Sequence, residues 1–179
     1  MPVDSLDNLL KKKGGTKESL CKKLSINNGK PLLGVVLDKK LSLSDEKVLR
    51  SILEGVSHID INIVVLTDTN VFDDKKVKHM SYDRRGRREL LEASDISLSF
   101  PFSDVQEILL NGTVPISPPR PEILDYNPNK ETGNGFVYEE SDCWCMFAAI
   151  VRALETFKFP HDWKNIVRQG LSSVSIQDA

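Results

Sequence analysis

The chain has 179 residues, of which 40% are hydrophobic and 28% are charged, and its formal net charge is -2 at pH 7. These values are typical of a soluble globular domain and give no reason to expect a nucleic-acid or membrane surface. No apolar run approaches the roughly 18 residues that a membrane helix needs. The N-terminus lacks a signal pattern, and an odd number of cysteines argues against a disulfide framework. We therefore expect a cytoplasmic protein.

The first 30 residues are polar and rich in lysine. The run Lys11–Gly15 predicts a mobile tail over residues 1–15. Residues 16–30 predict a linker that carries a short amphipathic helix, with Thr16 as its N-cap. We expect residues 31–172 to form the folded domain and residues 173–179 to form a C-terminal tail.

Apolar strands alternate with amphipathic helices over the rest of the chain. The run Leu32–Leu37 is typical of a strand that is buried on both faces of a parallel sheet. Residues Asp45–Val56 carry one apolar stripe at helical spacing, with Ser44 as the expected cap. This alternation predicts an α/β, Rossmann-like, doubly wound parallel sheet of about six strands. We expect strands at 32–37, 61–66, 77–82, 96–100, 114–117 and 136–139, and helices at 45–56, 85–93, 105–110, 142–157 and 161–169.

Ligands of such sheets bind beyond the carboxyl ends of the strands. This rule places candidate ligand loops at residues 38–43, 67–71, 82–84, 101–104 and 117–121. The basic cluster Arg84–Arg88 lies beside one of them. Because no aromatic residues are interleaved with it and the chain is mildly acidic, a solvated helix start is favoured over a phosphate-binding surface.

Metal and hydrolase chemistry find no support in the sequence. Cys143 and Cys145 form a C-x-C pair, but a metal site needs about four ligands within tetrahedral reach. The remaining cysteine and the three histidines are scattered without ligand spacing. No Ser or Cys lies at the spacing of a nucleophile elbow. We therefore expect no metal, no cofactor and no catalytic residue.

Several segments carry a resemblance to a known family. They occur in the order and at the spacing found in the C-terminal, nucleotide-sugar-binding domain of glycogen and starch synthases, and together the chain resembles that domain from about Thr16 to Ser172. The matching segments are Thr16–Ile26, Pro31–Val36, Ile63–Leu66, Ser81–Asp83, Leu90–Asp95, Asn111–Pro115 and Gly133–Tyr138. The family consists of GT-B glycosyltransferases that add glucose to an α-glucan. The resemblance implies one C-terminal-type GT-B domain and a donor such as ADP-glucose or UDP-glucose.

The chain departs from the family where the donor diphosphate is bound. A departing nucleotide diphosphate needs cations aimed at its developing charge. The family supplies an Arg and a Lys in the loop after its first strand, where a gapless match here places Asp38 and Leu43. Lys39 and Lys40 are the candidates to replace them, although a lysine does not reproduce the arginine fork.

Two further family motifs are altered. The family's Glu-containing turn is shortened to Phe100–Ile108, in which Gln106 matches a family Gln but the Glu has no aligned counterpart. After the fifth strand, Pro118 and Pro119 replace two glycines, and proline lacks the amide that would contact a ligand.

The resemblance leaves six candidates for binding a nucleotide-sugar donor. Tyr82 matches the family position that lies against the nucleobase, and a half-buried aromatic at a strand end is the alternative reading. Thr113 belongs to the retained motif at Asn111–Pro115. The complete set is Tyr82, Lys39, Lys40, Gln106, Thr113 and Arg120.

Three functions remain open from the sequence. The chain is the donor half of a truncated or split synthase, inactive alone and dependent on a separate N-terminal domain that supplies the acceptor half. Alternatively, it is a degenerate, non-catalytic interaction or regulatory domain, or a gene fragment. The missing cations and the missing acceptor half favour lost catalysis in isolation.

Overall fold

The computed structural model describes residues 3–68 and 76–175. Within these residues, six strands form one sheet in the order β3-β2-β1-β4-β5-β6, and every pairing is parallel. This is the strand order of a Rossmann fold, so the predicted fold class is confirmed. The strands are β1 (Leu32–Val36), β2 (Asn62–Leu66), β3 (Val77–Met80), β4 (Ile96–Leu98), β5 (Val114–Ser117) and β6 (Phe136–Val137).

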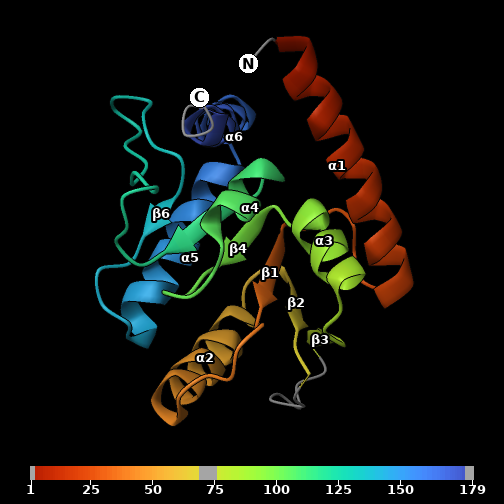
Figure 1. The fold of residues 1–179 in the computed structure, drawn as a ribbon, viewed down its shortest axis with the longest axis vertical. Helices are drawn as coiled ribbons and strands as arrows, with labels where there is room; N and C mark the ends of the chain where they lie inside the picture. The colour runs from red at the N-terminus through yellow and green to blue at the C-terminus, as the bar shows by residue number, and fades with distance from the viewer. Residues whose placement is uncertain (1–2, 69–75, 176–179) are drawn as a thin grey trace.

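The helices cover both faces of the sheet (Figure 1). Because side chains alternate along a strand, Leu32 and Val64 face a buried cluster shared with α1 and α3, whereas Leu33 and Val65 face the cluster that contains α2 and α5. Helix α6 packs against α4 and α5. The helices of the described residues are α1 (Val3–Leu24), α2 (Leu43–Val56), α3 (Arg84–Ala93), α4 (Val105–Leu110), α5 (Cys143–Phe157) and α6 (Pro160–Ser175).

The predicted tail over residues 1–15 is wrong for the part that the structure describes, because α1 is continuous from Val3 to Leu24. Thr16 therefore lies within the helix and does not cap it. Gly14 and Gly15 lower the intrinsic helix preference by about 1 kcal/mol each, but Leu6 and Leu20 on either side of them are buried. Tertiary packing of these side chains outweighs the glycines.

The other end of the chain is also longer than expected. Helix α6 extends to Ser175 instead of ending near Gln169, and Val174 is buried inside the predicted C-terminal tail. Residues 1–2 and 176–179, and the part of the predicted ligand loop at 69–71, lie outside the described residues. The division into linker and domain stays a prediction.

Polar caps determine where several helices begin. Asp83, Asp104 and Asp142 each accept a hydrogen bond from a backbone amide in the first turn of α3, α4 and α5. Ser42, and not the expected Ser44, does the same for α2. Among the described residues, no helix is both long and apolar enough to cross a membrane.

Candidate functional site at the switch point of the sheet

Strands β1 and β4 are neighbours in the sheet, although β2 and β3 separate them along the chain. The strand order reverses between them, and in open α/β sheets this switch point opens the crevice in which ligands bind. Three segments meet there. They are the turn after β1 at Asp38, the first half of α3, and the loop after β4 that leads into α4.

Arg87 of α3 occupies this crevice. Its Nη1 donates to Oδ2 of Asp38 at 2.8 Å, and its Nε donates to Oε2 of Glu107 at 2.8 Å. The same Nη1 is 3.2 Å from the hydroxyl of Tyr82. One guanidinium thus joins the ends of β1, β3 and the first turn of α4.

The local sequence explains why Arg87 reaches this position. Asp83 caps α3 by accepting from the Gly86 amide at 2.6 Å. A Cβ at Gly86 would lie 3.3 Å from Leu66, so the start of α3 approaches the end of β2 closely. Arg87 precedes Leu90 and Leu91 by three and four residues, and it therefore shares the helix face that turns toward the sheet.

The groups around Arg87 stabilise its charged form. Burial opposes the charged form, but hydrogen bonds to Glu107, Tyr82 and Asp38 outweigh that effect and raise the pKa of Arg87 above its ordinary value. The cluster nevertheless carries two carboxylates for one guanidinium, so its net charge is negative. A further anionic group, such as a phosphate, gains no net attraction from it.

Little space remains beside the cluster. The cavity lined by Asp38, Arg87 and Asp104 has a volume of about 10 Å³, which holds one water molecule at most. A larger cavity of about 120 Å³ lies further along the same edge, between Asp45 of α2, Phe102 and Met146 of α5. Its lining is mainly apolar. The switch point itself is closed to a diphosphate in this conformation.

The structure brings most of the predicted donor-binding residues to this edge. Tyr82 contacts Arg87, and the Lys39 ammonium lies 6.0 Å from the centre of the Phe102 ring. Lys40 is exposed in the same turn, and Gln106 is exposed in the first turn of α4, next to Glu107. Neither lysine forms an ion pair with a residue that the structure describes. They remain candidate cations for a ligand.

Arg120 has its donors engaged within the protein. Its guanidinium donates to the carbonyl oxygens of Ser103 at 2.9 Å and Pro101 at 2.8 Å, and it also reaches Phe100. The hydroxyl of Tyr138 donates to the Ser99 carbonyl at 2.9 Å. These bonds hold the loop after β4 in shape, so Arg120 positions the loop and has few donors left for a phosphate.

Thr113 lies at the opposite edge of the sheet. It precedes β5, is 1% exposed, and its single hydroxyl proton lies between the carbonyl oxygens of Leu91 at 2.6 Å and Ser94 at 2.9 Å. Its hydroxyl also accepts from the Lys13 ammonium at 2.6 Å. The retained sequence motif around Thr113 is therefore explained by packing at the amino ends of the strands.

Sequence reasoning missed Arg87, which was assigned to a solvated basic cluster. The signal that could have found it is its spacing to Leu90 and Leu91. The thiols of Cys143 and Cys145 are free. Within residues 3–68 and 76–175, no group of three His, Cys, Asp or Glu side chains is arranged to hold a metal ion.

Comparisons with known proteins support the fold. No family model matches the sequence, and no curated protein matches it. Among solved structures, the chain is similar to the catalytic domain of starch synthase IV from Arabidopsis thaliana bound to ADP and acarbose, with a TM-score of 0.75 and 16% identity over 93% of this chain and 41% of that one.

Two further structures are similar. The Anabaena protein HepE in complex with UDP-glucose matches with a TM-score of 0.67 and 13% identity, over 90% of this chain and 48% of that chain. Sucrose-phosphate synthase from Thermosynechococcus elongatus matches with a TM-score of 0.64 and 11% identity, over 89% of this chain and 44% of that chain. The present chain thus spans less than half the length of each of these structures.

These likenesses define the class of fold. The chain has the Rossmann-like fold of a GT-B glycosyltransferase domain, as the sequence resemblance predicted. At these identities the fold alone is shared.

Proposed function

We propose that this chain is the nucleotide-sugar-facing domain of a glycogen or starch synthase-like glycosyltransferase and that by itself it transfers no glucose. The fold supports the lineage, and the sequence resemblance supports ADP-glucose or UDP-glucose as the donor, in a cytoplasmic setting. The observation that carries the claim about activity is the Arg87 cluster, which fills the switch point of the sheet.

Electrostatics argue against tight binding of the donor diphosphate here. A diphosphate needs cations and free backbone amides, but Arg87 is already paired with Asp38 and Glu107. Lys39 and Lys40 lie nearby and form no ion pair with a described residue, but they are exposed and therefore attract a phosphate only weakly through water. The diphosphate of the donor therefore gains little binding free energy at this site.

The nucleobase of the donor has a more favourable contact than the diphosphate, namely the ring of Tyr82. Tyr82 is half-buried at the end of β3 and presents an aromatic ring beside the crevice. Stacking of one base contributes about 1–3 kcal/mol, which does not cover the entropy lost on association. We expect an affinity of about millimolar, with adenosine competing about as well as ADP-glucose.

Catalysis in this proposal requires a second domain. The chain carries one Rossmann-like sheet, and we propose that a separate acceptor-half domain faces the carboxyl edge of that sheet. The cation in the crevice, Arg87, is already paired with Asp38 and Glu107. Transfer by this chain alone is therefore not expected.

A transfer assay and a titration test the proposal. Purified chain is incubated with labelled ADP-glucose or UDP-glucose and glycogen, and we expect no incorporation that scales with protein concentration. Titration of ADP-glucose and of adenosine, followed by NMR, should give similar millimolar affinities. Low-micromolar binding of ADP-glucose that is lost with adenosine would show that the diphosphate site is intact and would overturn the proposal.

A non-catalytic interaction domain is the second candidate function. Trp144 and Leu43, in the first turns of α5 and α2, are 78% and 79% exposed. Both helices also line the 120 Å³ cavity at the carboxyl edge. Large exposed apolar side chains beside a small apolar cavity are typical of a protein-binding surface. This role is favoured if releasing Arg87 from its carboxylates creates no nucleotide binding.

A further inference from the structure

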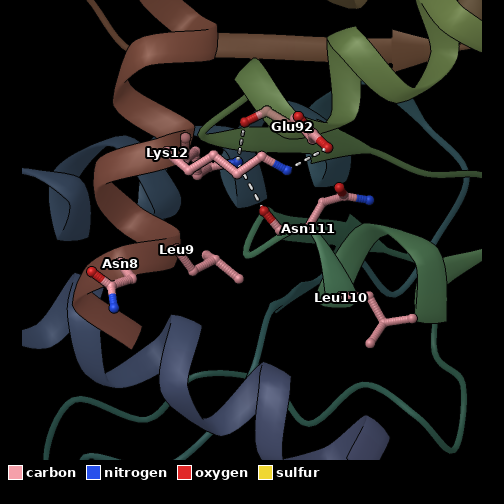
Figure 2. A pocket seen from close by; sticks show the side chains of 7 residues that line it. Asn8, Leu9, Lys12, Glu92, Leu110 and Asn111 are labelled. Carbon is pink, nitrogen blue, oxygen red and sulfur yellow. Dashed lines mark hydrogen bonds and ion pairs between the residues drawn. The ribbon is translucent and has the colours of Figure 1, made fainter. Parts of the chain in front are cut away.

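Another cavity lies at the other edge of the sheet, where the strands begin. It has a volume of about 280 Å³, is open to solvent on one side, and is bordered by α1 and the last turns of α3 and α4. Figure 2 shows Leu9 and Lys12 of α1 pointing toward Asn111 and Glu92, with Asn8 one turn before Lys12 on the same helix. We call it the α1 pocket; its lining residues are Asn8, Leu9, Lys12, Lys13, Glu92, Leu110 and Asn111.

Two leucines, Leu9 and Leu110, form the apolar part of the α1 pocket. Leu110 is 52% exposed, and Leu9 lies opposite it on α1 (Figure 2). A Cβ at Gly112 would lie 2.6 Å from Leu9, so Leu9 is held closely against the α4 turn. An apolar ligand body between the two leucines would remove hydrocarbon surface from water. The volume is just below the range of about 300–1,000 Å³ that small-molecule sites occupy.

The polar rim of the α1 pocket has a net positive charge. Lys12 and Arg88 share one oxygen of Glu92, at 3.1 Å and 3.0 Å. Two cations thus face one carboxylate, and Lys12 keeps two of its three N–H donors. The amide of Asn8 has no hydrogen-bond partner in the described part of the chain. The rim offers donors to an anion.

Lys13 lies beneath the rim, where its ammonium offsets the negative C-terminal ends of α3 and α4 that would otherwise repel an anion. Its ammonium donates to the carbonyls of Leu91, Glu92 and Asn111, at the negative ends of α3 and α4, and to Thr113. These carbonyl oxygens are therefore paired with an ammonium group and repel an anion less. Burial lowers the pKa of Lys13 to about 7. A lysine that is half-charged at neutral pH responds to any charge placed beside it.

We propose that the α1 pocket binds a small organic anion, a carboxylate on an apolar ring or short chain, with the body between Leu9 and Leu110 and the carboxylate on Lys12 and the Asn8 amide. The site is independent of the switch point, which lies at the opposite edge of the sheet. The residues that hold the ligand come from α1 and α4, so binding fastens α1 to the domain.

Binding is coupled to protonation of Lys13. The charged groups that face this ammonium are Asp95 at the start of β4, Lys17 on α1 and Glu92 on α3, and the contacts from α4 and β5 are uncharged. An added carboxylate favours the charged form and raises the pKa of Lys13. At pH 7 the protein therefore takes up part of a proton for each ligand bound.

Titration with benzoate tests the proposal. Benzamide has the same shape without the charge, and sulfate has charge without an apolar body. We expect benzoate to bind at least about tenfold more tightly than benzamide, because benzamide lacks the charge-assisted hydrogen bond to Lys12. We expect a similar advantage over sulfate, because sulfate has no apolar body to place between the leucines. NMR shifts should centre on α1 and the ends of α3 and α4. Calorimetry in two buffers of different ionisation enthalpy should reveal proton uptake.

Variants separate this site from non-specific binding. Lys12→Gln should weaken benzoate binding about tenfold or more, and Leu110→Asp, at a half-exposed position that does not endanger folding, should abolish it. Lys11→Gln on the solvent face of α1 is the matched control and should have no effect. Equal binding of benzoate and benzamide, no detectable binding of benzoate, or an unchanged affinity in Lys12→Gln would each overturn the proposal.

Discussion

Each edge of the sheet holds a basic side chain of low exposure, Arg87 at one and Lys13 at the other, and their surroundings differ. At the switch point of the carboxyl edge, Arg87 meets the carboxylates of Asp38 and Glu107, its pKa rises, and the cavity beside it is about 10 Å³. At the amino edge, Lys13 meets backbone carbonyls, its pKa falls to about 7, and a cavity of about 280 Å³ lies beside it.

This contrast shows that the fold does not decide where a ligand binds. A Rossmann sheet is expected to bind its ligand at the switch point of its carboxyl edge, but here that point is filled by an ion-paired cluster with a net negative charge. The amino edge, where the fold class predicts no ligand site, holds the larger cavity and Lys13 with its lowered pKa. The side chains around each edge determine which one is open.

The largest effect we predict concerns α1, which builds the amino edge. Leu6 is 1% exposed and belongs to the main core. Leu6→Ala should lower the free energy of unfolding by about 2–5 kcal/mol, measured by urea denaturation. Lys11→Ala on the exposed face of α1 is the control, with an expected change within about 0.5 kcal/mol. Equal and small effects of both would mean that the start of the chain is a tail.

The pH dependence of stability tests the environment of Lys13. The folded protein releases this proton near pH 7, whereas the unfolded chain keeps it up to 10.5. Between these values the unfolded chain binds more protons, so Lys13 makes stability rise by about 1.4 kcal/mol per pH unit. The contribution is lost as the pH falls through about 7.

Comparison with Lys13→Met isolates this effect, because the variant keeps the length of the side chain without the amine. Between pH 7 and 9, the free energy of unfolding of the native protein should rise with pH relative to that of the variant. Parallel curves for the two proteins would mean that the carbonyl cage of Lys13 keeps the ammonium charged at all these pH values.

Removing the guanidinium tests the cluster at the carboxyl edge. Arg87→Met leaves Asp38 and Glu107 without a partner, and we expect a loss of about 1–3 kcal/mol in the free energy of unfolding. The neighbouring Arg88, whose side chain is 73% exposed, supplies the control. Arg88→Met should change stability by about 0.5 kcal/mol or less. If the two variants are equally stable, Arg87 is solvated, as the sequence had suggested.

The sheet could be predicted from the sequence because its signals are local. Apolar runs such as Leu32–Leu37 and helical stripes such as that of Asp45–Val56 determine element type and alternation, and the handedness of βαβ units restricts the topology. The extent of α1 could not be predicted, because its stability comes from contacts of Leu6 and Lys13 with α3, α4 and α6, which are distant in the sequence.

The candidate site could be predicted only in outline. The rule for parallel sheets located the loops, and the family resemblance identified Tyr82 and the altered turn after β1. The pairing of Arg87 with Asp38, 49 residues away, and with Glu107, 20 residues away, depends on the packed sheet. Thr113 was predicted from a matching family motif, but it lies at the amino edge of the sheet and packs there instead of facing the donor site.

Calorimetric titration with ADP of the native protein and of the double variant Asp38→Asn, Glu107→Gln tests the central claim most directly. Both substitutions keep the size of the side chain and release Arg87 from its carboxylates, and adding Arg87→Met to the double variant is the control. We predict millimolar or weaker binding by the native protein, at least about tenfold tighter binding by the double variant, and loss of this gain in the control. Low-micromolar binding by the native protein, or no gain in the double variant, would contradict the claim that the Arg87 ion pairs close the diphosphate site.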